Sequence, residues 1–175
     1  MVDDAATDEP LDFATRYDFL KSLVARYDSY YNLAAVKASL LLTSNAIFLA
    51  PSLGERSPWL QLARPGGPSH VLVVVSMLLS LLSMIAAALV IASWLSRSGA
   101  IVRRHSLAFS ESVATYSADD YAVQVGIATR KAVIDDLARL AHLMASNLTS
   151  KFHYVNISLV MLVAAVLCAC MAVLF

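Results

Sequence analysis

Residues 71–95 read VLVVVSMLLSLLSMIAAALVIASWL, a run of hydrocarbon side chains interrupted by four serines. No Asp, Glu, Lys or Arg occurs between Pro65 and Ser96. At about 1.5 Å per residue, a helix over this run reaches about 37 Å, enough to cross a membrane core of about 30 Å with some tilt. Core helices of soluble proteins are shorter and carry a polar stripe. The run therefore predicts a transmembrane helix.

Two further apolar runs flank this one. Residues 155–175 read VNISLVMLVAAVLCACMAVLF, and residues 38–54 are also free of charge. The earlier run extends back to residue 32 past Lys37, whose long side chain can reach the lipid headgroups from one turn inside the span. A buried core helix is the alternative for this earlier run. Three spans are the preferred interpretation.

Composition excludes several classes of protein. The chain has 175 residues, of which 59% are apolar and 15% charged, against about 45–50% and about 25% in soluble domains. Two cysteines cannot build a disulfide framework. The 13 basic and 13 acidic residues cancel, so no overall positive field attracts nucleic acid. A soluble enzyme is not expected.

The positive charges predict the orientation. Of the 13 Lys and Arg residues, 11 lie on one side: ten before residue 32 or in residues 97–154, and Lys37 one turn inside the start of the first span. Basic loops stay in the cytoplasm, so the N-terminus and residues 97–154 are expected inside and the short loop outside.

The predicted fold class is an all-α membrane protein with three transmembrane helices, the first and third extended into cytoplasmic helical stalks. Phe13, Tyr17, Leu20 and Val24 recur at helical spacing in the first stalk, and one unbroken rod is expected from Asp119 to Phe175. Apolar seams on such stalks favour self-association. The predicted division is an N-terminal arm (1–31), the first span (32–53), an external loop (54–69), the second span (70–96), a basic segment with stalk (97–154) and the third span (155–175).

No catalytic motif is found. The chain has no P-loop, HExxH, GxSxG or glycine-rich dinucleotide turn, and none of its four histidines pairs at i, i+4. No enzyme activity, metal or resident cofactor is expected. Asp135 and Asp136 are adjacent, so on a helix they diverge by about 100°. A solvated face with Lys131 and Arg139 is the preferred interpretation of this pair.

Arg103, Arg104 and His105 form a basic run with three possible roles. The run can determine topology, attract anionic lipid or bind a phosphate, for which the planar arginine fork is suited. Tyr121 and Asp119 follow nearby and offer a stacking ring and an acceptor for a base edge. Spacing alone does not separate these roles.

Three polar residues in or beside the spans are assigned to packing or gating: Lys37, Asn45 and Lys151. Asn45 in mid-span costs free energy unless it bonds to another helix. It is therefore expected to join helices or to face a pore.

Three stretches together resemble the transmembrane effectors of bacterial Pycsar anti-phage defence. They are Lys37-Ala38 through Leu40-Leu41-Leu42-Thr43 to Asn45, then Leu107-Ala108-Phe109 with Ser117-Ala118-Asp119-Asp120-Tyr121, then Asp136-Leu137 through Ala141 and Met144 to Lys151-Phe152. Their order and spacing cover nearly the whole chain from Phe13. The family often has an acid two residues before the lysine, and Ala35 stands there in this chain.

The resemblance implies a function. A cognate uridylate or cytidylate cyclase makes cCMP or cUMP, and the effector senses it and impairs the bacterial inner membrane, which aborts infection. The implied partners are membrane lipid, the nucleotide and further copies of the chain, with no nucleic acid. The resemblance maps no nucleotide contact. The alternative function is a non-gated adaptor or structural protein that self-associates through its stalks.

Overall fold

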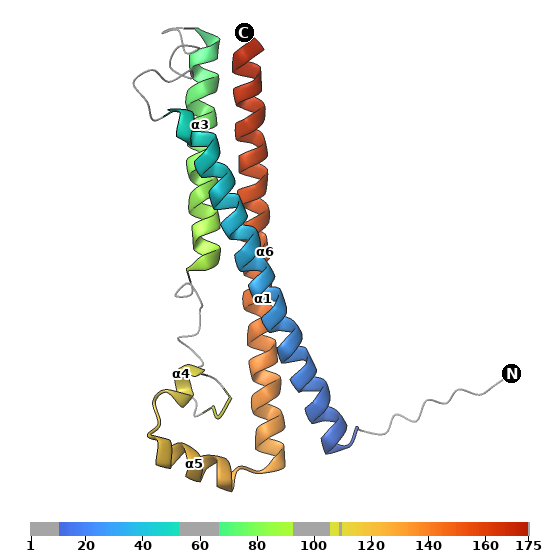
Figure 1. The fold of residues 1–175 in the computed structure, drawn as a ribbon. Helices are drawn as coiled ribbons and strands as arrows, with labels where there is room; N and C mark the ends of the chain where they lie inside the picture. The colour runs from blue at the N-terminus through green and yellow to red at the C-terminus, as the bar shows by residue number, and fades with distance from the viewer. Residues whose placement is uncertain (1–10, 53–66, 93–105, 109, 175) are drawn as a thin grey trace, which may run out of the picture. The chain divides into compact units, whose positions relative to one another are not determined.

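The computed structural model describes residues 11–52, 67–92, 106–108 and 110–174, and no strand occurs in them (Figure 1). The elements in chain order are α1 (Phe13–Leu49), a 3-10 turn (Ala50–Ser52), α3 (Pro68–Ile91), α4 (Ser110–Val113), α5 (Ala118–Ile127) and α6 (Arg130–Leu174). Three of them, α1, α3 and α6, are long and apolar enough to cross a membrane. The predicted all-α class with three long apolar helices is confirmed.

The chain divides into two compact units. The first unit comprises residues up to Asp28 and Ser98–Ser146, and the second comprises Ser29–Arg97 and Asn147–Phe175. Helices α1 and α6 each begin in the first unit and end in the second. Each unit is described by itself below.

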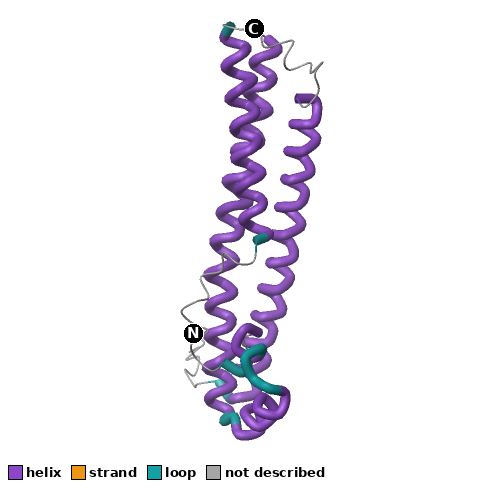
Figure 2. The backbone as a smooth tube through the Cα atoms, turned by 90° about the vertical axis from the view of Figure 1, so that its left-hand side faces the viewer, coloured by secondary structure: helices purple, strands orange, loops and turns teal. Residues whose placement is uncertain are grey.

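The second unit packs three helices around small side chains, and α1, α3 and α6 lie side by side in both views (Figures 1 and 2). Ala34 and Ala38 of α1 and Ala87 of α3 are fully buried, and Val155 of α6 joins them. Small residues let helix backbones approach closely, which is how helices associate in a membrane. Alanines at the centre of this unit therefore let the helices pack closely, with Leu41 and Val90 completing the core.

Large apolar side chains of the second unit point outward instead. Ile47 is 69% exposed, Val160 67% and Leu167 61%. Such exposure would be costly in water, since apolar surface favours removal from it. It suits a bundle whose outer face contacts lipid, as the uncharged runs predict.

Local signals set the helix ends. Asp12 caps α1, because its Oδ1 accepts a hydrogen bond from the Thr15 amide at 3.0 Å. Hydrogen bonds from Thr15 lower the pKa of Asp12. Gly67 precedes α3 and Pro68 occupies its first turn, where a missing N–H costs nothing. Most of the predicted external loop, 54–69, lies outside the described residues.

The expectation of one rod from Asp119 to Phe175 is wrong. Helix α5 ends at Ile127 and Ala128 is extended. Thr129 then caps α6, its hydroxyl accepting a hydrogen bond from the Ala132 amide at 3.2 Å. The 45 residues of α6 still span about 68 Å. The break arises because a threonine that competes for backbone hydrogen bonds favours a cap over a helix interior.

Candidate functional site

A polar cluster of the first unit surrounds one carboxylate oxygen. Asp136, in the second turn of α6, accepts three hydrogen bonds on Oδ2. The donors are the Ser106 hydroxyl at 2.9 Å, the Leu107 amide at 2.8 Å and the Ala108 amide at 3.0 Å. Successive backbone N–H groups that converge in this way form a nest, a concave site for anions. We call Ser106, Leu107 and Ala108 the 106–108 nest.

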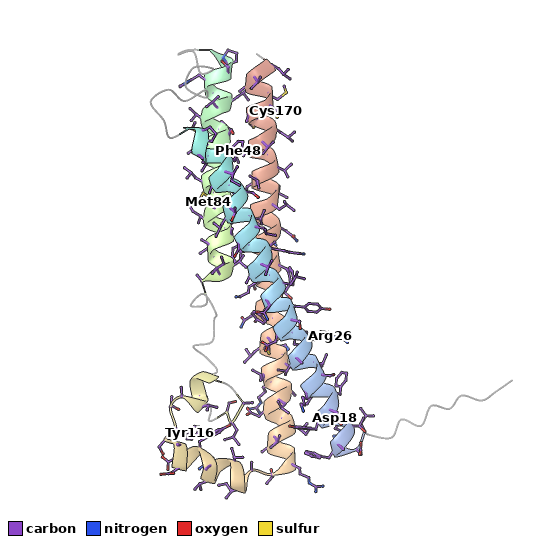
Figure 3. All side chains as sticks on the ribbon, in the orientation of Figure 1. Asp18, Arg26, Phe48, Met84, Tyr116 and Cys170 are labelled. Carbon is purple, nitrogen blue, oxygen red and sulfur yellow. The ribbon has the colours of Figure 1, made fainter. Side chains whose placement is uncertain are left out.

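Tyr121 holds the same segment from α5. Its hydroxyl donates to the Leu107 carbonyl at 2.9 Å, and its ring lies 6.3 Å from the ring of Tyr116, centroid to centroid (Tyr116 is labelled in Figure 3). Leu107 therefore has its amide bound to α6 and its carbonyl bound to α5.

The start of α5 is fixed by Ser117. Its hydroxyl accepts from the Asp120 amide at 3.1 Å and donates to the Asp120 carboxylate at 2.6 Å. Ser117 therefore caps α5, and the Asp120 carboxylate binds the capping hydroxyl. The cap places Tyr121 on the first turn, within reach of Leu107.

The second unit carries a polar network among its helices, which we call the polar seam. Asn45 is fully buried on α1. Its Nδ2 donates to Ser83 Oγ at 2.9 Å and to the Leu41 carbonyl at 2.8 Å, and its Oδ1 accepts from Ser80 Oγ at 2.7 Å. Every polar atom of the Asn45 side chain therefore has a partner, and two partners lie on α3.

The seam continues from α3 to α6. Ser83 Oγ donates to the Ser158 carbonyl at 2.7 Å, and Ser158 Oγ donates in return to the Ser83 carbonyl at 2.9 Å. Ser76 Oγ donates to the Ala165 carbonyl at 2.9 Å. The serines at 76, 80 and 83 recur at spacings of four and three, so one face of α3 bears them all.

Two lysines of the second unit contact aromatic rings. Lys151 Nζ donates to the Val90 carbonyl at 3.0 Å and lies 5.1 Å from the Tyr31 ring centroid. Val90 is in the last turn of α3, where carbonyls lack helical partners and the helix dipole favours a cation. Lys37 Nζ lies 5.7 Å from the Phe152 ring centroid. With alanine at position 35, the partner of Lys37 is a ring rather than an acid.

In the described part of the chain, no three His, Cys, Asp or Glu side chains are grouped to hold a metal ion. Cys168 is half-buried and Cys170 is exposed, and both are free thiols (Cys170 is labelled in Figure 3).

The Pycsar effector protein domain, a known family, matches residues 19–175. The chain belongs to this family. The expected resemblance is thereby confirmed, and the protein is an effector of anti-phage defence. No curated protein and no solved structure gives a significant match to the chain.

The stretches that carry the Pycsar likeness supply both polar clusters. Leu107 and Ala108, Tyr121 and Asp136 come from the second and third stretches and meet in the first unit. Asn45 comes from the first stretch and lies in the seam. The second and third stretches, which were recognised by their order and spacing, thus contact each other directly in this Pycsar effector.

The predicted site residues have different outcomes. Arg103, Arg104 and His105 lie outside the described residues. Asp119 is exposed on the first turn of α5, near Tyr121 in sequence. Asn45 joins helices, one of the two roles expected for it.

The sequence interpretation of Asp136 is wrong. Its carboxylate is half-buried and bound by the nest, whereas Asp135, Lys131 and Arg139 are exposed. Sequence reasoning also missed Ser106 and the seam serines of α3. The seam had a visible signal, because serines at helical spacing in an uncharged span mark one polar face.

Proposed function

We propose that this Pycsar effector binds a cyclic pyrimidine mononucleotide, cCMP or cUMP, and in response impairs the inner membrane, so that the infected cell stops growing before phage matures. Membership of the effector family over residues 19–175 carries the proposal. The two units suggest a division of labour between sensing and membrane damage.

The first unit is the proposed sensor. It holds the 106–108 nest and the paired rings of Tyr116 and Tyr121, which suit a phosphate and a base. Arg103, Arg104 and His105 directly precede Ser106 in the chain and add three cationic or hydrogen-bonding groups. With Tyr121 and Asp119, these residues are the proposed ligand contacts.

The second unit is the proposed membrane-active part. Its apolar outer face suits lipid, and its polar groups are satisfied inside one bundle. The same groups can bond between copies if the helices repack in a homo-oligomer, because serine and asparagine hydrogen-bond across helices in membranes. Asn45, with Lys37 and Lys151, is the proposed packing or gating set.

The proposed orientation places the sensor where the nucleotide is made. Of the 13 Lys and Arg residues, 11 lie at or before Lys37 or in residues 97–154, which favours a cytoplasmic first unit. To move a dormant population from 1:99 to 99:1 active, the ligand must favour the active state by about 10⁴-fold, or about 5.5 kcal/mol. Charge-assisted hydrogen bonds to a phosphate are among the strongest available for this.

The test is dye release from liposomes. Purified full-length protein is reconstituted into vesicles that enclose a self-quenched dye, and cCMP, cUMP or cAMP is added outside. We expect release with a cyclic pyrimidine and none with cAMP. Intact vesicles with both pyrimidines, with insertion verified by protease protection, would contradict the proposal. If the protein then also copurified with one stoichiometric partner, the adaptor function would replace it.

A further inference from the structure

The 106–108 nest is built for an anionic oxygen. Two successive amides and a hydroxyl converge on one oxygen of Asp136 at 2.8 to 3.0 Å. A carboxylate and a phosphodiester both present acceptor-only oxygens that share a negative charge. The donors that bind Asp136 therefore match the needs of a cyclic nucleotide phosphate.

The nest is not wholly enclosed. Ser106 is 9% exposed, but Leu107, Ala108 and Asp136 are only half-buried. The acceptor comes from α6, a different element from the donors, so it can withdraw without unfolding the nest. The Leu107 carbonyl is bound by Tyr121 of α5 and not by Asp136, so displacement of the carboxylate does not itself break that hydrogen bond.

We infer that the 106–108 nest is the phosphate site of the sensor and that Asp136 occupies it as a built-in competitor until ligand arrives. This inference rests on the proposed function for the identity of the ligand. A cyclic nucleotide displaces the Asp136 carboxylate, and the displacement frees the start of α6 from the 106–108 segment. Because α6 is one continuous helix from Arg130 to Leu174, its first turns are covalently part of the helix that enters the second unit.

A tethered competitor lowers the apparent affinity of the ligand. The effective concentration of a group on a short tether is in the millimolar range, so phosphate must compete with it. Asp136→Asn weakens the competition, because the amide oxygen can still accept from the nest but carries no negative charge. Nucleotide affinity should then rise, whereas a residue that merely braced the site would lower it.

The experiment compares Asp136→Asn with Asp135→Asn in the full-length protein in detergent. The control removes the same charge one residue earlier, from an exposed side chain. Binding of cCMP and cUMP is measured by calorimetry, and circular dichroism verifies folding. We expect Asp136→Asn to bind at least tenfold more tightly than Asp135→Asn. Equal or weaker binding by Asp136→Asn overturns the inference.

A second variant locates the site. Adding Ser106→Ala to Asp136→Asn removes one nest donor and should weaken binding about tenfold, since a hydrogen bond to a charged group contributes about 1.5–3 kcal/mol. An unchanged affinity places the ligand elsewhere and overturns the inference.

A further measurement tests the phosphate site separately from the proposed function. Dimethyl phosphate, a phosphodiester with neither sugar nor base, is titrated into the same variants and followed by phosphorus NMR. Ser106-dependent binding by Asp136→Asn supports the nest even if no cyclic pyrimidine causes leakage. If the wild type leaks with cCMP or cUMP but Asp136→Asn binds no phosphodiester, the nest is overturned and the proposed function stands.

Discussion

The Asn45 side-chain amide donates a hydrogen bond to the Ser83 hydroxyl across 2.9 Å, and both side chains are fully buried. The Ser83 hydroxyl in turn donates to the Ser158 carbonyl, so one chain of hydrogen bonds crosses from α1 through α3 to α6. Such a chain favours this helix register, because a shift of one helix would break these hydrogen bonds. It also gives the bundle polar groups that can be re-paired when the helices move.

Asn45→Ala should destabilise the second unit by about 1 kcal/mol, the scale of hydrogen bonds between membrane helices. The substitution removes bonds to Ser80 and Ser83. Reversible unfolding in mixed micelles measures the loss.

Ser44→Ala is the matched control for Asn45→Ala. Ser44 is the neighbouring residue, but it is exposed, and its hydroxyl donates to the Leu40 carbonyl of its own helix at 2.9 Å. An equal loss of stability in both variants would contradict a structural role for the seam.

The presence of three long apolar helices was predictable because it depends on the chain alone. A long uncharged apolar run is stable in lipid but not in water, and its length determines whether it can cross the bilayer. The Ser117 cap was predictable for a similar reason, since donor and acceptor lie three residues apart. The role of Asn45 in joining helices was one of two predicted for it, because a polar amide in mid-span needs a hydrogen-bond partner.

The role of Asp136 was not predictable, because its partners lie 28 to 30 residues away in sequence. The pattern around it reads equally well as a solvated helix face. The break at Ala128 was missed because apolar residues recur at helical spacing on both sides of it. A single capping threonine does not change that spacing. Contacts between distant segments, and a helix break that leaves the apolar spacing intact, are therefore what the sequence pattern did not reveal.

Lys151→Met should loosen the end of α3. The variant keeps an apolar stem but removes the ammonium from the Val90 carbonyl and the Tyr31 ring. A cation at a helix C-terminus contributes about 0.3–1 kcal/mol. We expect faster hydrogen exchange in the last turn of α3, measured by mass spectrometry. Lys131→Met, which removes the same charge from an exposed position in the first unit, should leave that turn unchanged.

Gly126→Ala should stabilise α5 by about 0.5–1 kcal/mol, because glycine in a helix costs backbone entropy. An added Cβ at this position meets no atom within 4 Å. The result expected is slower hydrogen exchange in α5. Ala122→Gly, on the same helix and exposed, should have the opposite effect. Faster exchange in Gly126→Ala would show that Gly126 serves the turn before α6 instead.

The first turn of α1 should loosen in acid. Hydrogen bonds from Thr15 lower the pKa of Asp12, so the cap is fully formed above the ordinary aspartate pKa of about 3.9. It is lost as the pH falls through the lowered value. The Thr15 amide resonance should follow this titration in micelles. Asp12→Asn, which keeps a capping oxygen but does not titrate, should abolish the pH dependence.

Tyr121→Phe should weaken nucleotide binding about three- to tenfold. The variant removes the hydroxyl that holds the Leu107 carbonyl at 2.9 Å but keeps the ring beside Tyr116. One hydrogen bond contributes about 0.5–1.5 kcal/mol, and the nest becomes less ordered before ligand arrives. Tyr17→Phe, which alters an exposed ring of the same unit, is the control. Tyr121→Ala should lose more than Tyr121→Phe if the ring also contacts the base, and equal losses would assign the effect to the hydroxyl alone. Binding by Tyr121→Phe that equals the control would show that the Leu107 contact does not prepare the nest.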